Sequence, residues 1–213
     1  KQYLDNLGFS KNIIQNFFLP FFSGIFLENS LKTPSRMFEF VFKMFGEGLG
    51  VLPKGGIEDI SKQLKEKLQS TEIHYNTLVS KVKNKVITLS NGKKIESHYI
   101  IIATEPSSLV ENLKKQQLDW KSCENLYFTC ANRVYDKAFI GLVSNKESLI
   151  NNIFYPTSLK TIQRGKSDLI SVTVVKKHGL SEKDLINQVK IELKKECKIE
   201  NARFLKLYNL PKA

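Results

Sequence analysis

The chain has 213 residues, 41% of them hydrophobic, and a formal net charge of +12. This length can bury one or two cores, but no apolar run reaches the roughly 20 residues that a membrane-spanning helix needs. The positive charge makes nucleic acid a candidate partner. All but four of the 33 basic residues are lysine, however, and specific base contacts favour arginine. We therefore predict no nucleic-acid partner.

The cysteines indicate a reducing compartment and no metal site. There are three of them, Cys123, Cys130 and Cys197, with no metal-ligand spacing. An odd number of unclustered thiols is typical of packed, reduced cysteines. Polar, helix-like sequence follows Lys1, without the pattern of a secretory signal. We expect a cytoplasmic protein.

The first predicted helix begins after Ser10, a residue type that caps helices, and ends at Pro20. A cluster of phenylalanines surrounds this break. This cluster has three interpretations: a hydrophobic core, the wall of an apolar substrate pocket, or a patch that contacts a membrane surface. The cluster comprises Phe17, Phe18, Phe21, Phe22 and Phe26.

Two more helices are predicted before residue 70. Ser35 can cap a helix that is apolar nearly all round and that ends at the glycines of 46–50; we expect this helix to be buried. After Gly56, isoleucine and leucine recur with helical spacing over residues 57–68. Acidic residues in the first turn of that segment suit the positive end of the helix dipole.

A strand, a hairpin and a second strand are predicted next. Residues 78–83 form the first strand, and Asn91-Gly92 predicts a type I′ turn between strands at 85–89 and 93–97. Residues 99–103 are an unbroken apolar run, which predicts a strand covered on both faces. Another helix is expected to begin at Glu105 and to extend to residue 114.

The second half is predicted to consist mainly of strands. A composition shift falls around residues 116–124. Ser181 is then predicted to cap a long helix, and a last strand follows. The strands are predicted at 126–132, 138–143, 153–155, 169–175 and 203–208.

Motif searches exclude several classes of site. Two glycines at 50 and 55 have the spacing of a phosphate-binding loop, but Gly56 stands where that loop requires lysine. The chain contains no G-x-G-x-x-G and no G-x-S-x-G. We therefore predict no phosphate cradle and no hydrolase nucleophile within these residues.

The order of the remaining features resembles a known family. An aromatic-rich helix precedes the Pro-x-Gly-Gly turn at 53–56; a strand with Val79, a hairpin and an apolar strand ending in Ala103-Thr104 follow. This order is similar to that of FAD-dependent amine oxidases and phytoene desaturase-like oxidoreductases, and the similarity covers nearly the whole chain. The resemblance implies FAD and a hydrophobic small-molecule substrate, and leaves amines, carotenoid precursors and porphyrinogens open.

The resemblance also implies site residues. The backbone of Val79 would contact the FAD adenine, and Ala103 and Thr104 would approach the dinucleotide from its other side. Gly55 and Gly56 would face the flavin ring, although a plain helix-entry turn explains them equally well. The phenylalanine cluster would line the substrate channel, and catalytic residues stay unassigned.

The resemblance implies an α+β (mixed α/β) fold: a mainly antiparallel substrate-domain sheet with packed helices, plus part of an FAD-binding domain. Residues 1–50 and 117–213 would form the substrate domain, and residues 51–116 the FAD-binding part. The family's pyrophosphate loop and C-terminal flavin motif are absent from these residues, so we expect the chain by itself to bind FAD weakly or not at all and to be inactive. The alternatives are a non-catalytic module that binds a hydrophobic ligand or a protein, and a basic nucleic-acid binder. No obligate protein partner is expected; peripheral membrane contact stays open.

Overall fold

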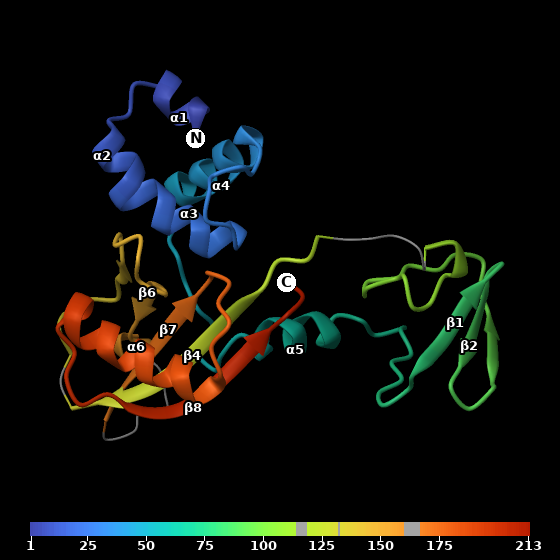
Figure 1. The fold of residues 1–213 in the computed structure, drawn as a ribbon. Helices are drawn as coiled ribbons and strands as arrows, with labels where there is room; N and C mark the ends of the chain where they lie inside the picture. The colour runs from blue at the N-terminus through green and yellow to red at the C-terminus, as the bar shows by residue number, and fades with distance from the viewer. Residues whose placement is uncertain (114–118, 132, 160–166) are drawn as a thin grey trace. The chain divides into compact units, whose positions relative to one another are not determined.

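The computed structural model describes residues 1–113, 119–131, 133–159 and 167–213. The chain divides into two compact units (Figure 1). The first comprises residues 1–60 and 120–213, and the second comprises residues 61–119. The predicted boundary between residues 116 and 117 lies outside the described residues, and the division into substrate and FAD-binding parts stays a prediction.

The first unit contains a five-stranded sheet in which every neighbouring pair is antiparallel. Its strand order is β5-β6-β7-β4-β8. The predicted α+β class with a mainly antiparallel sheet is confirmed. The strands are β4 (Cys123–Cys130), β5 (Ile140–Leu142), β6 (Ile150–Phe154), β7 (Asp168–Val174) and β8 (Arg203–Leu210).

Helix α6 (Glu182–Cys197) covers one face of this sheet (Figure 1). It begins as predicted at Ser181, whose side chain accepts a hydrogen bond from the backbone N–H of Asp184. Alternate residues of the central strands point toward the helix and are buried, as a pleated strand requires. The core that results includes Leu126, Phe128, Ile170, Val172, Leu185, Val189 and Leu193.

A group of helices precedes the sheet in the first unit. The prediction that Pro20 ends the first helix is wrong, because the helix continues to Phe26. Proline lacks a backbone N–H, and here it lies in the first turn of α3, directly after a π-helical turn. Ser10 caps the segment as predicted. The elements are α1 (Gln2–Asn6), α2 (Lys11–Ile13), η1 (Ile14–Phe18) and α3 (Leu19–Phe26).

Helix α4 (Ser35–Glu47) forms where it was predicted, but the expectation that it is buried is wrong. Phe40 is 57% exposed and Phe45 is 56% exposed. The side that carries Phe38 and Val41 packs against the aromatic cluster of η1 and α3, where Phe45 also contacts Phe21 at 5.5 Å between ring centroids. Ser35 is the first helical residue rather than the cap, which is Pro34.

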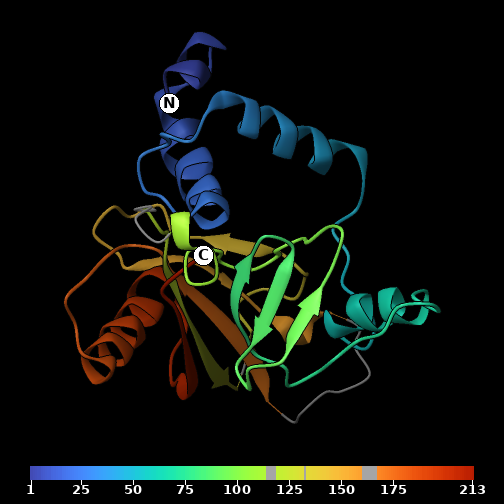
Figure 2. The same ribbon diagram turned by 90° about the vertical axis from the view of Figure 1, so that its right-hand side faces the viewer.

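The second unit is built around a three-stranded antiparallel sheet, drawn in green in Figure 2. Its strands are β1 (Val79–Lys83), β2 (Val86–Leu89) and β3 (Lys94–Glu96), and the predicted hairpin is confirmed. The turn type differs from the prediction: Gly92 has a φ of 85°, but Asn91 lacks the positive φ that type I′ requires. Asn84 and Lys85, at φ 48° and 64°, take positive φ between β1 and β2 instead.

The predicted strand over residues 99–103 is wrong. Tyr99 is 89% exposed and Ile101 is 93% exposed, and no described strand pairs with this segment. An apolar run becomes a buried strand only where a neighbouring strand supplies hydrogen bonds. The helix expected from Glu105 is reduced to a short 3₁₀ turn, η2 (Glu111–Leu113), and residue 114 lies outside the described residues.

Two short elements complete the fold. Helix α5 (Glu58–Glu66) follows the Pro-x-Gly-Gly turn as predicted, and η3 (Pro156–Ser158) follows β6. Within the part of the chain that the structure describes, no helix combines the length and the apolar character that crossing a bilayer requires.

Candidate functional site

A cavity of about 550 Å³ in the second unit is the candidate cofactor site. Val79 and Val82 of β1 form part of its wall, and the apolar residues 100–102 form another part. Ala103 and Thr104 also line it. The structure thus brings three predicted FAD contacts, Val79, Ala103 and Thr104, to one cavity, although Val79 lies more than 20 residues before the other two in the sequence.

The cavity lies beside the outer edge of β1. β1 is an outer strand of its sheet, and the backbone N–H of Val82 donates to the carbonyl of Leu109 at 2.9 Å. The loop that carries Leu109 therefore folds over this edge. Residues 100–103 belong to no strand, so their backbone groups can hydrogen-bond to a ligand.

These walls fit the adenine of a flavin nucleotide. A planar aromatic ring is bound between apolar side chains, while a few polar groups fix its orientation. Apolar side chains come here from β1 and from residues 100–102, and the backbone of residues 100–104 lines the same cavity. Glu105, which was not among the predicted site residues, also lines the cavity.

Gly55 and Gly56 form the turn that starts α5. The N–H of Gly55 donates to Asp59 Oδ2 at 3.0 Å, and Gly56 takes a φ of 106° that favours glycine. A Cβ on Gly55 would lie 2.4 Å from the Asp59 oxygen. This geometry explains both glycines as a helix-entry turn. Because they belong to the first unit, their contact with a flavin ring stays a prediction.

The phenylalanine cluster forms a packed core in the first unit. Phe18 is 3% exposed and Phe22 is 1% exposed, and Phe21 and Phe26 pack partly buried against them. Phe17 is 38% exposed and stacks on Phe21 at 5.3 Å between ring centroids. The cavity beside Phe22 and Phe26 measures only about 50 Å³. That these side chains line a substrate pocket stays a prediction.

Burial favours the neutral forms of two side chains in the first unit, the thiol of Cys197 and the phenol of Tyr155. Burial raises the pKa of the Cys197 thiol to about 11, with the negative charges of Glu196 and Glu192 adding to this effect. Burial also raises the pKa of Tyr155 to about 12. A thiol that stays protonated is a poor nucleophile. Among the described residues, no three metal-ligating side chains are clustered.

The comparisons with known proteins agree with this architecture. The profile of the family described as flavin-containing amine oxidoreductase matches residues 2–205. Among solved structures, reduced UDP-galactopyranose mutase is similar at a TM-score of 0.69 and 14% identity, covering 96% of this chain and 54% of that chain. The PF1083 protein of Pyrococcus furiosus is similar at a TM-score of 0.56 and 13% identity, covering 72% and 42%.

At these identities the two solved structures establish a shared fold. This chain spans about half the length of each, 54% and 42%. No curated protein matches the sequence. The family profile spans nearly the whole chain. The chain belongs to the flavin-containing amine oxidoreductase family.

Proposed function

We propose that the protein is an FAD-dependent oxidoreductase and that the cavity of the second unit binds the adenosine side of FAD. The observation that carries this proposal is the meeting of Val79, Ala103 and Thr104 at one cavity. Membership of a flavin-containing family supports a flavin cofactor. The apolar walls from β1 and residues 100–102 provide the environment that an adenine ring needs.

In this proposal the chain orients the cofactor and excludes water, and FAD, when bound, accepts the hydride or electrons from the substrate. Val79 and Val82 would cover one face of the adenine. The backbone at Ala103 and Thr104 would hydrogen-bond to the nucleotide. No protein acid or base is assigned, because the chemistry belongs to the cofactor.

We propose a hydrophobic small-molecule substrate for the same enzyme. Aromatic side chains are concentrated in η1, α3 and α4, and several of those on α4 are exposed. Such a surface suits an apolar substrate or peripheral contact with a membrane. Cytoplasmic localisation, the absence of a nucleic-acid partner and the absence of an obligate protein partner belong to this proposal.

These 213 residues by themselves are proposed to be inactive and to bind FAD weakly. They contain no G-x-G-x-x-G, the loop that holds the pyrophosphate of a dinucleotide against a helix N-terminus. A cavity for adenosine alone provides only part of the binding energy of FAD.

The absorption spectrum of the purified full-length gene product tests the proposal. Bound flavin gives bands near roughly 370 and 450 nm, because the cofactor carries its own chromophore. A protein that is colourless and stays colourless after addition of FAD would overturn the oxidoreductase proposal. It would favour the alternative, a non-catalytic module that binds a hydrophobic ligand or a protein.

A further inference from the structure

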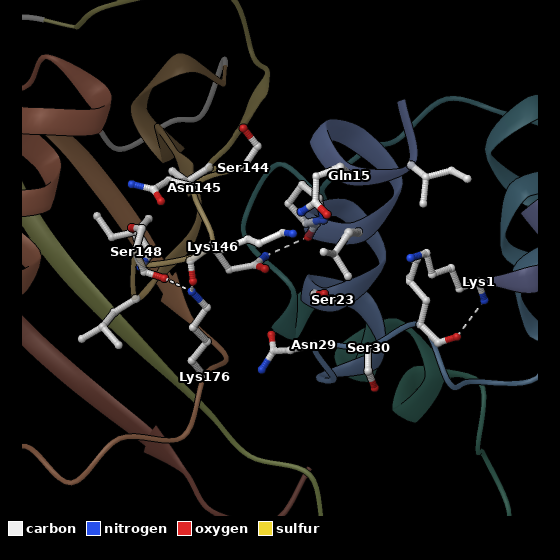
Figure 3. A pocket seen from close by; sticks show the side chains of 18 residues that line it. Lys1, Gln15, Ser23, Asn29, Ser30, Ser144, Asn145, Lys146, Ser148 and Lys176 are labelled. Carbon is white, nitrogen blue, oxygen red and sulfur yellow. Dashed lines mark hydrogen bonds between the residues drawn. The ribbon is translucent and has the colours of Figure 1, made fainter. Parts of the chain in front are cut away.

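A separate cavity of about 460 Å³ lies inside the first unit (Figure 3). One wall comes from η1 and α3 and carries Gln15 and Ser23. The other wall comes from the turn between β5 and β6 and from the end of β7, and carries Lys146 and Lys176. Figure 3 shows these two sets of side chains on opposite sides of the cavity. It is not the cavity proposed for FAD.

Among the described residues, the charged side chains that line this cavity are all positive. Lys146 and Lys176 are among its lining residues, together with Lys1, and no aspartate or glutamate is. The Lys176 amine donates to the backbone carbonyls of Lys146 and Ser148, which fixes its position. Burial lowers the pKa of Lys176, and the nearby carboxylates of Glu147 and Glu192 oppose that shift.

Glu192, a buried carboxylate that acts electrostatically on Lys176, is hydrogen-bonded to the turn between β5 and β6. Its Oε2 accepts from Ser148 Oγ at 2.5 Å and from the backbone N–H groups of Leu149 and Ile150 at 2.8 and 3.0 Å. Its Oε1 accepts from Gln188 at 2.9 Å. These bonds engage both of its oxygens and hold the turn, while the charge of Glu192 still acts on Lys176.

Gln15 has a hydrogen-bonding capacity that the fold does not use. Its Nε2 is buried and has no hydrogen-bond partner among the described residues, although Gln15 lines the cavity. Buried amide groups without a partner are rare in folded proteins and require an explanation. Gln15 lies in the π-helical turn η1, a form of helix that often occurs at functional sites.

We propose that this cavity binds a phosphate group, free or carried on a small organic molecule. Lys146 and Lys176 supply the charge, as lysine does when it binds phosphate as a point charge. The amide of Gln15 turns about its last side-chain bond to donate to a phosphate oxygen. The cavity has the volume of a small-molecule site, which leaves room for an organic group beside the phosphate.

NMR titration of the chain at constant ionic strength tests this proposal, with the side-chain amide of Gln15 as the reporter. The probes are inorganic phosphate, phenyl phosphate and acetate. We expect the Gln15 signal to shift and saturate with phosphate, and to respond little to acetate. Tighter binding of phenyl phosphate would identify a phosphate ester as the ligand; equal affinity would identify free phosphate.

Two variants and a matched control separate the site from general charge effects. Lys146→Met and Lys176→Met should each weaken phosphate binding by about tenfold, as expected when one charge-assisted contact is lost. Lys190→Met removes the same charge from the exposed face of α6 and should leave the affinity unchanged. Lys176→Met also removes the hydrogen bonds from Lys176 to the turn and can unfold it. In that case Lys146→Met still tests the proposal.

Three results would overturn the proposal. The first is a Gln15 signal that does not shift, or shifts without saturating. The second is acetate binding as tightly as phosphate, which would indicate a site for any anion. The third is an equal loss of affinity in Lys190→Met. Each result is independent of flavin content, so it leaves the proposed oxidoreductase function unaffected.

Discussion

The two units of the chain differ sharply in how they bury apolar residues. In the first unit, β7 lies between β4 and β6, and Ile170, Val172 and Val174 are each at most 1% exposed. Among the described residues of the second unit, only Leu89 is buried. Residues 99–103 are as apolar as β7 but pair with no described strand and are largely exposed.

This contrast shows that hydrophobicity alone does not make a strand. β7 has hydrogen-bonding partners on both edges and α6 across one face, so its alternating side chains gain both ladder bonds and burial. Residues 99–103 have neither. The surface that they expose is instead part of the cavity wall that we propose for FAD.

The largest expected effect is at the centre of the packed unit. Phe128→Ala removes a fully buried ring that packs on Phe204 at 5.7 Å between centroids. We expect the free energy of unfolding to fall by about 4 kcal/mol, measured by urea denaturation. Ile101→Ala, at an exposed position of the second unit, is the control and should change it by less than about 0.5 kcal/mol. Equal losses of stability in the two variants would contradict the contrast in burial between the two units.

Glu192→Ala is expected to cost about 3 kcal/mol, because it leaves the Ser148 hydroxyl and two backbone N–H groups without their charged acceptor. Urea denaturation measures the loss. Glu200→Ala serves as the control: its side chain is 65% exposed in its ion pair with Lys194, and such pairs contribute little. If Glu192→Ala lowers the free energy of unfolding by less than about 1 kcal/mol, the hydrogen bonds to Glu192 do not stabilise the fold as described.

Glu28→Gln should destabilise the protein in a pH-dependent way. Burial raises the pKa of Glu28, but backbone hydrogen bonds from Thr33 and Lys32, with the side chains of Ser30 and Thr33, outweigh it and lower the pKa to about 2. A lowered pKa means that the carboxylate stabilises the fold above its unfolded pKa, and that this contribution is lost as the pH falls to about 2.

The expected loss for Glu28→Gln is roughly 1 kcal/mol at neutral pH, since partial exposure screens the interaction. The difference from the unsubstituted chain should shrink below about pH 4.5, the ordinary value for the group, and vanish near pH 2. Melting temperatures across this range provide the measurement, with the exposed Glu47→Gln as the control. A difference independent of pH would show that Glu28 acts through shape rather than charge.

The smallest effect should be a gain. Lys85 takes a φ of 64° in the turn between β1 and β2, a conformation that costs a residue with a Cβ more than it costs glycine. Lys85→Gly creates an Asn-Gly turn and should stabilise the chain by about 0.5 kcal/mol. Lys94→Gly, within β3, is the matched control and should destabilise it. Thermal melting distinguishes them, and a loss with Lys85→Gly would contradict the assigned turn.

Local signals predicted many elements well. Ser10 and Ser181 mark helix starts because their side chains can accept a bond from the first helical turn. The strands of the large sheet follow from alternating or continuous apolar segments. The turn types were not predictable in the same way: Asn91-Gly92 has the residues of a type I′ turn, but the positive φ pair occurs at Asn84 and Lys85.

Several features depend on contacts between segments that are distant in the sequence, and local sequence patterns did not predict them. Pro20 was expected to end a helix, yet the chain continues through it after a π-helical turn. Burial of α4 depended on which neighbours cover it, and its pattern of residues does not contain that information. The cofactor residues Val79, Ala103 and Thr104 were identified by family resemblance, and only the folded chain brings them to one cavity. The unpartnered amide of Gln15 has no sequence signal at all.

The most direct measurement is the flavin content of the purified full-length gene product with and without Ala103→Trp. The indole would fill the cavity beside Val79, whereas Ala138→Trp, at an exposed position of the first unit, would not. We predict that the unsubstituted protein and Ala138→Trp retain bound flavin and that Ala103→Trp loses most of it while remaining folded. Full flavin content in a folded Ala103→Trp protein would contradict the assignment of this cavity to FAD.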